Sequence, residues 1–392
     1  MTFDNSYFED EVREGFYIPG MVKRSWATQL EILESVIKIC NRHDLKWFAG
    51  YGTLLGAVRH HGFIPWDDDL DICMLKDDYD RFVEYAVREL PRKYAVLNIY
   101  KRNEYSNFLT RILNHDIIDT REEFMNENCG FPFASGIDIF PLHYLYPDDK
   151  KEEIRRQKAH KIWKLIEDNK NLGVNDGQRF IREIEEISGM KLRLDIPPEN
   201  AIYRILDAVF SEAPKEGATH VTLMPIWAEH KAQKFPIELF DNLIRVPFEN
   251  TQILIPAAYN KTLKLIYGNW EIANRKGGLH NYPFYKGQEE EMEKHYGRLP
   301  YKYYYGEDSS KESSVKLTNN TIVSILDTLE AACKMISLLY QTKDLPLTNL
   351  DKRISCLPER YRRCPYMHEA VRKYAAEEPG QERIRNGRFR RS

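Results

Sequence analysis

Apolar residues in the first 90 positions recur with spacings that separate helices from strands. Over residues 28–41 they fall at every third or fourth position, which predicts a helix with one buried face. The run 45–52 predicts a strand that ends in a turn, and 53–60 predicts a short helix. Residues 70–74 then predict a short apolar strand, and 77–90 predict a second long helix.

The middle of the chain alternates apolar runs with polar turns. YAVLNIY, NFLTRIL, DIIDT and GIDIF predict three or four more strands between Tyr94 and Pro141. Residues 151–169 predict a charged helix, 172–220 predict two or three more, and FPIELF, NLIRVPF and QILIPAAY predict short strands. These elements together predict an α+β fold, in which helices flank a mixed sheet.

The character of the sequence changes at about residue 300. YKYYYGEDSSKESS predicts a polar connector, the apolar positions from Ile322 to Leu339 predict a long amphipathic helix, and QERIRNGRFRRS forms a basic tail. This helix and tail fit two interpretations: docking with contact to anionic lipid, or an ordinary packing helix with a solvated end. We therefore expect an N-terminal extension (1–25), a catalytic domain (26–299) and an additional helical C-terminal region (300–392).

Charge and cysteine usage narrow the class of protein. The net charge of −3 gives no global attraction to nucleic acid or to an anionic membrane. Six cysteines without a CxxC pair argue against a disulfide scaffold or a zinc ribbon. No signal-like N-terminus and no uncharged apolar run of about 18 residues is present. We expect a cytoplasmic protein that binds no nucleic acid, with peripheral contact at the inner face of the membrane as an open alternative.

The densest chemical signal is GYGTLLGAVRHHGFIPWDDDLDICM, in which four aspartates follow a glycine-rich segment. Side chains alternate along a strand, so Asp69 and Asp71 should point to the same side. Two carboxylates this close repel each other unless a cation neutralises them, and oxygen ligands favour Mg²⁺ or Mn²⁺. Asp67 and Asp68 are second choices as ligands. A solvated acidic turn or a helix cap is disfavoured, because apolar and aromatic residues surround the aspartates.

Two other readings of this region are weaker. His60 and His61 beside the aspartates could suggest zinc, but adjacent histidines point to different sides and no HxxxH or HExxH spacing follows. Four aromatic residues could form a cage for a quaternary ammonium group. Core packing is the commoner role of any one of them in a chain with 48 aromatic residues. The four are Trp66, Tyr267, Trp270 and Tyr282.

A Gly-Thr turn followed by Asp-x-Asp on the next strand resembles the polymerase-β-type nucleotidyltransferases. Three longer segments resemble the LicD family of phosphotransferases, to which fukutin-type proteins are related. These segments are GTLLGAVRHHGFIPWDDDLDI, SGIDIFPLHYLYP and KFPIELFDNLIRVPFENTQILIPAAYNKTLKLIYGNW. The resemblance covers about residues 26–290. One departure is His143, where the family usually has an acid.

The resemblance implies roles for particular residues. Asp69, Asp71 and Asp138 would be the catalytic carboxylates and would bind one or two Mg²⁺ or Mn²⁺ ions, and Asp138 would also accept the acceptor's proton. The alternative for Asp138 is a buried carboxylate that is satisfied by backbone N–H groups or by a neighbouring arginine. The donor would be bound by residues of the turn and by residues near it. These residues are Gly52, Thr53, Arg59, Arg111 and Trp66. A surface salt bridge remains the alternative for Arg59, and core packing remains the alternative for Trp66.

Three functions follow from these observations. The first is transfer of a phosphoryl-alcohol unit, such as phosphocholine, from a CDP-activated donor to a hydroxyl of a cell-surface glycan or its lipid-linked precursor, with release of CMP. Teichoic acid and lipopolysaccharide are acceptors of this kind. The second is a glycosyltransferase that uses Asp-x-Asp to hold a nucleotide sugar. In such enzymes a full nucleotide-binding half usually precedes the Asp-x-Asp motif. Here the motif already ends at Asp71, which leaves too little chain for that half, so this function is disfavoured. The third is a non-catalytic glycan-binding protein.

Overall fold

The structure is a computed structural model that describes residues 2–169, 177–193, 195–273 and 282–296. Contacts divide the chain into one unit of Met1–Leu172 with Gln178–Ile325 and a second of Gly173–Gly177 with Leu326–Ser392. The predicted connector, amphipathic helix and basic tail after residue 300 lie outside the described residues. No helix in the described ranges has both the length and the apolar character needed to cross a bilayer.

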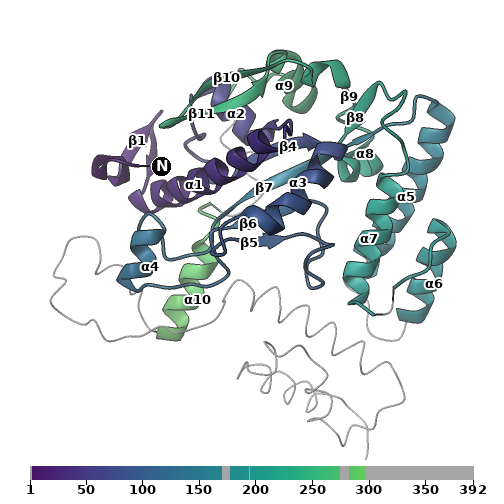
Figure 1. Ribbon diagram of the computed structural model, residues 1–392, viewed down its shortest axis with the longest axis horizontal. Helices are drawn as coiled ribbons and strands as arrows, with labels where there is room; N and C mark the ends of the chain where they lie inside the picture. The colour runs from purple at the N-terminus through teal and green to yellow at the C-terminus, as the bar shows by residue number, and fades with distance from the viewer. Residues whose placement is uncertain (1, 170–176, 194, 274–281, 297–392) are drawn as a thin grey trace, which may run out of the picture. The chain divides into compact units, whose positions relative to one another are not determined.

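The main sheet has seven strands and mixed directions. Its central path runs β3-β4-β7-β6-β5, and β8 extends it from β7 to β9. β4 and β7 are parallel, whereas the other neighbouring pairs are antiparallel. This mixed sheet with flanking helices confirms the predicted fold class (Figure 1). The strands are β3 (Phe48–Ala49), β4 (Leu70–Leu75), β5 (Ala95–Leu97), β6 (Thr110–Leu113), β7 (Gly136–Tyr144), β8 (His220–Thr222) and β9 (Phe235–Pro236).

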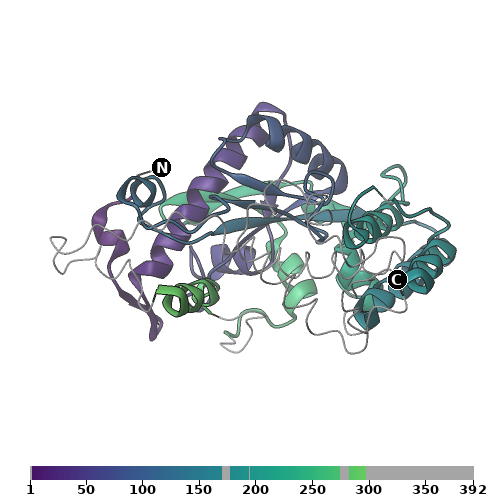
Figure 2. The ribbon, with the colours of Figure 1, turned by 90° about the horizontal axis from the view of Figure 1, so that it is seen from below.

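Helices cover the sheet on both sides, as the view along its edge shows (Figure 2). The helices are α1 (Gly20–Arg42), α2 (Tyr51–Arg59), α3 (Lys76–Glu89), α4 (Glu122–Glu127), α5 (Asp149–Asn169), α6 (Gly177–Ser188), α7 (Pro198–Phe210), α8 (Met224–His230), α9 (Tyr259–Tyr267) and α10 (Lys286–Tyr296). Short 3₁₀ turns occupy η1 (Asn5–Phe8) and η3 (Ile237–Phe240). Two hairpins stand apart from the main sheet: β1 (Glu11–Arg13) with β2 (Phe16–Ile18), and β10 (Leu243–Phe248) with β11 (Thr251–Pro256).

The core forms on the face of the sheet that α1 and α3 cover. Leu70, Ile72 and Met74 of β4 are fully buried in one cluster with Trp26 and Leu30 of α1. Each such side chain contributes about 1.5–3 kcal/mol by leaving water. Because side chains alternate along a strand, residues 71 and 73 of β4 and residues 138 and 140 of β7 point to the opposite face. That second face carries the polar groups described below.

Most of the predicted elements are present, but two predictions need correction. Residues 28–41 belong to a longer helix, because Asp10 accepts a hydrogen bond from the N–H of Gly20 at 2.7 Å and so satisfies the start of α1 eight residues earlier than expected. DIIDT is not a strand. Its Asp119 carboxylate pairs with Arg121, and the Asp119 N–H donates to Pro132, so this segment follows a loop rather than a sheet edge.

Candidate active site

The aspartate segment is fixed to the fold through Asp68. This residue is fully buried, its carboxylate accepts a hydrogen bond from the N–H of Phe284 at 2.6 Å, and its carbonyl accepts one from the Gln29 amide at 2.7 Å. Gln29 is itself fully buried on α1. The structure therefore places Asp68 as an anchor between α1 and the segment before α10, which argues against its candidate role as a metal ligand.

Gly52 allows the Asp67 carboxylate to approach the first turn of α2. A Cβ at position 52 would lie 2.5 Å from Asp67 Oδ2, so a side chain there would require the Asp67 carboxylate to shift. The N-terminus of a helix carries partial positive charge and favours anions. In this structure the side chain of Asp67 is the anion at that position.

Thr53 connects α2 to β4. Its hydroxyl accepts a hydrogen bond from the N–H of Asp71 at 2.7 Å, and the residue is 3% exposed. The N–H of Gly50 in turn donates to the carbonyl of Asp71 at 2.9 Å. Both backbone groups of Asp71 are thereby held. The structure gives Gly52 and Thr53 these positions in the first turn of α2, and their contact with a donor phosphate stays a prediction.

Three charged residues form a row across adjacent strands. Asp71 of β4 is paired in register with Asp138 of parallel β7, and Asp138 is paired in register with Arg111 of antiparallel β6. This confirms the prediction that the GIDIF strand lies beside the strand at 70–74. The guanidinium of Arg111 donates from Nε to Asp138 Oδ1 and from Nη2 to Asp138 Oδ2, both at 2.6 Å.

The electrostatics of the row are unbalanced at Asp71. Burial raises the pKa of Asp71 well above its usual value, and the charges of Asp69, Asp138 and Asp67 raise it further, against the opposing effect of Arg111. Burial lowers the pKa of Arg111, but Asp138 outweighs burial, so the net shift is upward and Arg111 stays charged. One guanidinium thus faces several carboxylates, and the ionised cluster needs a further positive charge.

The carboxylate oxygens of this site are of the type that binds divalent cations, but the structure does not bring together a complete set of ligands. Carboxylate oxygens suit Mg²⁺ or Mn²⁺, and a cation would relieve the repulsion around Asp71. Within the described residues, however, no group of three or more His, Cys, Asp or Glu side chains is arranged to hold a metal ion. Both oxygens of Asp138 already accept from Arg111. Asp69 and Asp71 are therefore the best-placed ligands, and Asp138 would have to share its oxygens with Arg111.

Arg59 ends α2 on the side of the site that α9 covers. Its Nη1 donates to the carbonyl of Trp270 at 3.1 Å, and no ion pair between Arg59 and an aspartate is found among the described residues. Burial lowers the pKa of Arg59, partly offset by Glu14 and Tyr267. The salt-bridge alternative is thus not observed. The predicted contact between Arg59 and a donor phosphate is not tested by this geometry.

Tyr267, at the C-terminal end of α9, was not predicted to border the aspartates. Partial burial raises its pKa, and the charges of Asp71, Asp67 and Asp69 raise it further. The sequence offered only its aromatic character as a signal. α9 packs on α2, and residues more than 200 positions apart in the chain meet there.

Trp66 packs against other rings. It lies edge-on to Phe16 at a centroid distance of 6.0 Å and to His60 at 5.8 Å. Tyr282 also contacts Phe16, and its hydroxyl donates to the carbonyl of Pro65 at 3.3 Å. These contacts favour the packing interpretation of Trp66 and Tyr282, and the contact of Trp66 with a donor stays a prediction.

His143 lies on the other face of β7 from Asp138. It is 1% exposed, its Nε2 is 3.5 Å from Oδ1 of Asp207, and burial lowers its pKa. Asp207 of α7 also accepts a hydrogen bond from the Tyr100 hydroxyl at 2.7 Å. His143 is therefore part of a buried polar cluster that joins the sheet to α7, away from the row of Asp71, Asp138 and Arg111.

A mixed sheet that carries acidic side chains from the parallel strands β4 and β7, beside the first turn of α2, defines an enzyme of the nucleotidyltransferase fold. Residues 44–147 match the sequence profile of the LicD/FKTN/FKRP nucleotidyltransferase domain. The chain is 46% identical over 259 residues to the lipopolysaccharide cholinephosphotransferase LicD of Haemophilus influenzae, which covers 62% of this chain and 88% of that protein. The chain therefore belongs to the LicD family, and it is an enzyme of the phosphotransferase class.

Two shorter similarities add little to this assignment. An uncharacterized protein of Rickettsia typhi is 40% identical over 52 residues, 13% of this chain and 17% of that protein. An uncharacterized protein of Rickettsia prowazekii is 42% identical over 48 residues, 12% of this chain and 18% of that protein.

Proposed function

We propose that this enzyme transfers a phosphoryl-alcohol unit, phosphocholine in the first instance, from a CDP-activated donor to a hydroxyl of a cell-surface glycan or its lipid-linked precursor. The name of the Haemophilus relative supports phosphocholine and lipopolysaccharide as donor group and acceptor. The observation that carries the proposal is the row of Asp71, Asp138 and Arg111 with Asp69 and Asp67 beside it. Phosphoryl transfer needs this kind of charged, rigid surface.

The reaction is a substitution at the phosphorus that carries the alcohol. The acceptor oxygen forms a bond to that phosphorus, the bond to the bridging oxygen of the diphosphate breaks, CMP leaves with the bonding electrons, and the acceptor's proton passes to a base. A bound divalent cation would supply positive charge to the phosphoryl oxygens. The chain's own residues position the groups and take the proton.

Asp138 is the proposed base, and Arg111 holds it in place. A carboxylate offers about four lone-pair sites, so the two bonds from Arg111 leave Asp138 able to accept a proton or share a cation. Arg111 and Arg59 are the proposed contacts for the donor phosphates. Arg111 uses Nε and Nη2 on Asp138, so its Nη1 is the group left for a phosphate oxygen. Asp69 and Asp71 would hold Mg²⁺ or Mn²⁺.

The proposal is tested by supplying purified enzyme with lipopolysaccharide and CDP-choline, CDP-ethanolamine, CDP-ribitol, UDP-glucose or GDP-mannose, with Mg²⁺ or with EDTA. We expect CMP release from one of the CDP donors and a new phosphodiester on the glycan, detected by ³¹P NMR, with Mg²⁺ only. Asp71→Asn serves as the inactive control and Asp116→Asn, at an exposed position, as the active one. Release of UDP or GDP with sugar transfer would instead establish the glycosyltransferase reading.

A further inference from the structure

One side of α9 is exposed, although it carries apolar groups beside lysines. Lys261 and Lys264 are exposed, and Leu265 and Tyr267 keep 41% and 43% of their surface in contact with solvent. Thr262 and Leu263 on the opposite side are buried. We call Lys261, Lys264, Leu265 and Tyr267 the α9 surface.

The α9 surface borders the candidate active site at one end. Tyr267 is the last residue of α9, α9 packs on α2, and the hydrogen bond from Arg59 to the Trp270 carbonyl fixes the segment after α9 to α2. Lys264 and Lys261 lie about 4.5 and 9 Å further back along the helix axis, at about 1.5 Å per residue. The surface therefore leads outward from the carboxylates.

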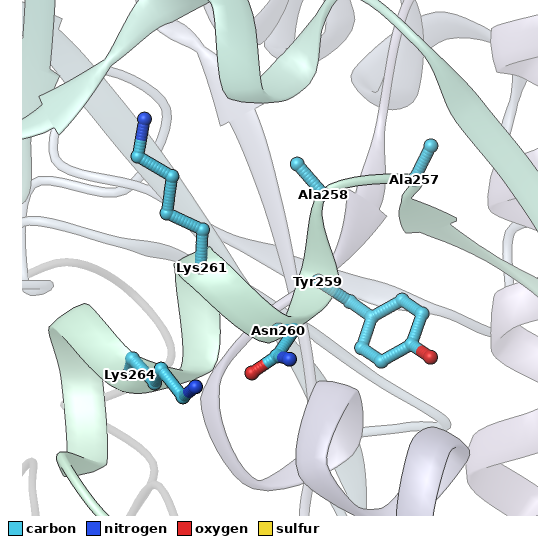
Figure 3. A pocket seen from close by; sticks show the side chains of 6 residues that line it. All are labelled: Ala257, Ala258, Tyr259, Asn260, Lys261 and Lys264. Atoms are coloured by element: carbon cyan, nitrogen blue, oxygen red, sulfur yellow. The ribbon is translucent and has the colours of Figure 1, made fainter.

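A shallow pocket lies at the outer end of this surface (Figure 3). It has a volume of about 520 Å³ and is lined by Ala257, Ala258, Tyr259, Asn260, Lys261 and Lys264. A pocket of this size accommodates a small ligand or a sugar residue. The small side chains of Ala257 and Ala258 leave the space open, and the two lysines set its charge.

Charge and distance together identify the ligand class. The donor's negative charges are in its diphosphate, which must reach the row of Asp71, Asp138 and Arg111, so they cannot also reach lysines on the outer turns of α9. A ligand that binds these lysines must therefore carry negative charge outside the donor's diphosphate. An acidic acceptor would be repelled by the aspartates, and lysines beside its path offset that repulsion. The ion pair of Lys261 with Glu238, at 3.6 Å and well exposed, is weak enough to exchange.

We propose that the α9 surface binds the acceptor glycan, with Lys261 and Lys264 on its phosphate or carboxylate groups and Tyr267 against the sugar nearest the carboxylates. This inference rests on the proposed function, because it assigns the acceptor of the same reaction. It extends that function by adding a specificity for acidic glycans and by identifying the surface that binds them.

The test uses full-length enzyme, Mg²⁺, the CDP donor established above and purified lipopolysaccharide, before and after enzymatic removal of its phosphates. The variant is Lys261→Glu/Lys264→Glu. The matched control is Lys161→Glu/Lys164→Glu, two lysines at the same spacing on an exposed side of α5, of which one also pairs with a carboxylate. We expect the α9 variant to raise the acceptor KM at least tenfold and leave the donor KM within about twofold. The control should match the wild type, and phosphate removal should abolish the difference between variant and wild type.

The outcomes distinguish failure of this inference from failure of the proposed function. An unchanged acceptor KM in the α9 variant, or an equal rise in the control, overturns this inference while the proposed function stands. Loss of binding to vesicles of phosphatidylglycerol and phosphatidylethanolamine with an unchanged acceptor KM also overturns it, because the surface would then bind membrane. Absence of any transfer by the wild-type enzyme overturns the proposed function and this inference with it.

Discussion

Two buried carboxylates in this protein have opposite surroundings. Glu152 of α5 accepts hydrogen bonds from Arg155 at 2.7 and 2.9 Å, from the indole of Trp227 at 2.8 Å and from the N–H of Tyr146 at 2.9 Å. Asp71 of β4 is surrounded by other carboxylates, which raise its pKa together with burial. The first charge is satisfied by the chain itself.

The difference separates a structural charge from a functional one. A buried charge that is surrounded by donors joins parts of the fold, here α5, α8 and the segment after β7, and needs no further partner. A buried charge crowded by like charges is costly to the fold and persists where catalysis requires it. The comparison predicts that substitutions at the two places act on different quantities: stability at Glu152, and turnover at the aspartate row.

The largest expected effect is at the satisfied charge. Arg155→Met leaves Glu152 buried without its cation, so the free energy of unfolding should fall by about 3–5 kcal/mol. Urea unfolding followed by circular dichroism measures it. The double variant Glu152→Gln/Arg155→Met should recover much of the loss, since no uncompensated charge remains. A loss below 1 kcal/mol in the single variant would show that the Glu152 charge is not a structural charge of this kind.

Asp138→Asn tests the crowded side with a change of charge and little change of shape. We expect turnover to fall at least ~100-fold, about 2.7 kcal/mol, with a melting temperature close to that of the wild type. CMP release and thermal unfolding are the two measurements. If turnover survives, Asp138 serves only to pair Arg111, and its catalytic role is refuted.

His115 is a third kind of buried group, because it avoids charge. Burial lowers its pKa to about 3, and its Nδ1 accepts from the N–H of Ile117 at 3.3 Å. Below pH 6.5 the unfolded chain gains a proton that folded His115 does not. The stability advantage of the wild type over His115→Gln should therefore shrink as the pH falls from 6.5 toward 3, by up to about 1.4 kcal/mol per pH unit. Urea unfolding of both proteins at pH 7.0, 6.0 and 5.0 measures it, and a difference independent of pH would refute it.

Arg59→Ala should have the smallest effect of the four, because Arg59 is only partly buried and its hydrogen bonds to the Trp270 carbonyl and to Nδ1 of His60 are long, at 3.1 and 3.4 Å. We expect the donor KM to rise about tenfold, about 1.4 kcal/mol, with partial rescue by Arg59→Lys. Arg42→Ala is the control, since Arg42 also ends its helix and is exposed. A lower melting temperature with an unchanged donor KM would show that Arg59 only fixes the segment after α9.

The sequence was sufficient where local pattern decides the structure. The family resemblance brought Asp138 beside Asp71 across 66 intervening residues, and β4 and β7 pair there. Strand alternation predicts that Asp69 and Asp71 point to the same side, but Asp69 precedes β4, so this pairing stays a prediction. What could not be predicted depends on distant contacts. The anchoring of Asp68 needs Phe284, the start of α1 needs Asp10, and the position of Tyr267 needs α9 to pack on α2. The Arg111–Asp138 pair needed the register of β6 against β7, which no single strand contains.

The central claim is that the crowded carboxylate Asp71 exists for phosphotransfer, and the rate of CMP release by Asp71→Asn, read beside its melting temperature in EDTA, tests it most directly. Because the folded pKa of Asp71 is raised, its ionisation destabilises the fold as the pH rises from about 4 through that pKa, so the neutral amide should keep or increase the melting temperature at pH 7.5. The account predicts a rate at least ~1000-fold below wild type, about 4 kcal/mol, in a protein that is no less stable. A rate near that of the wild type in a stable variant would contradict it.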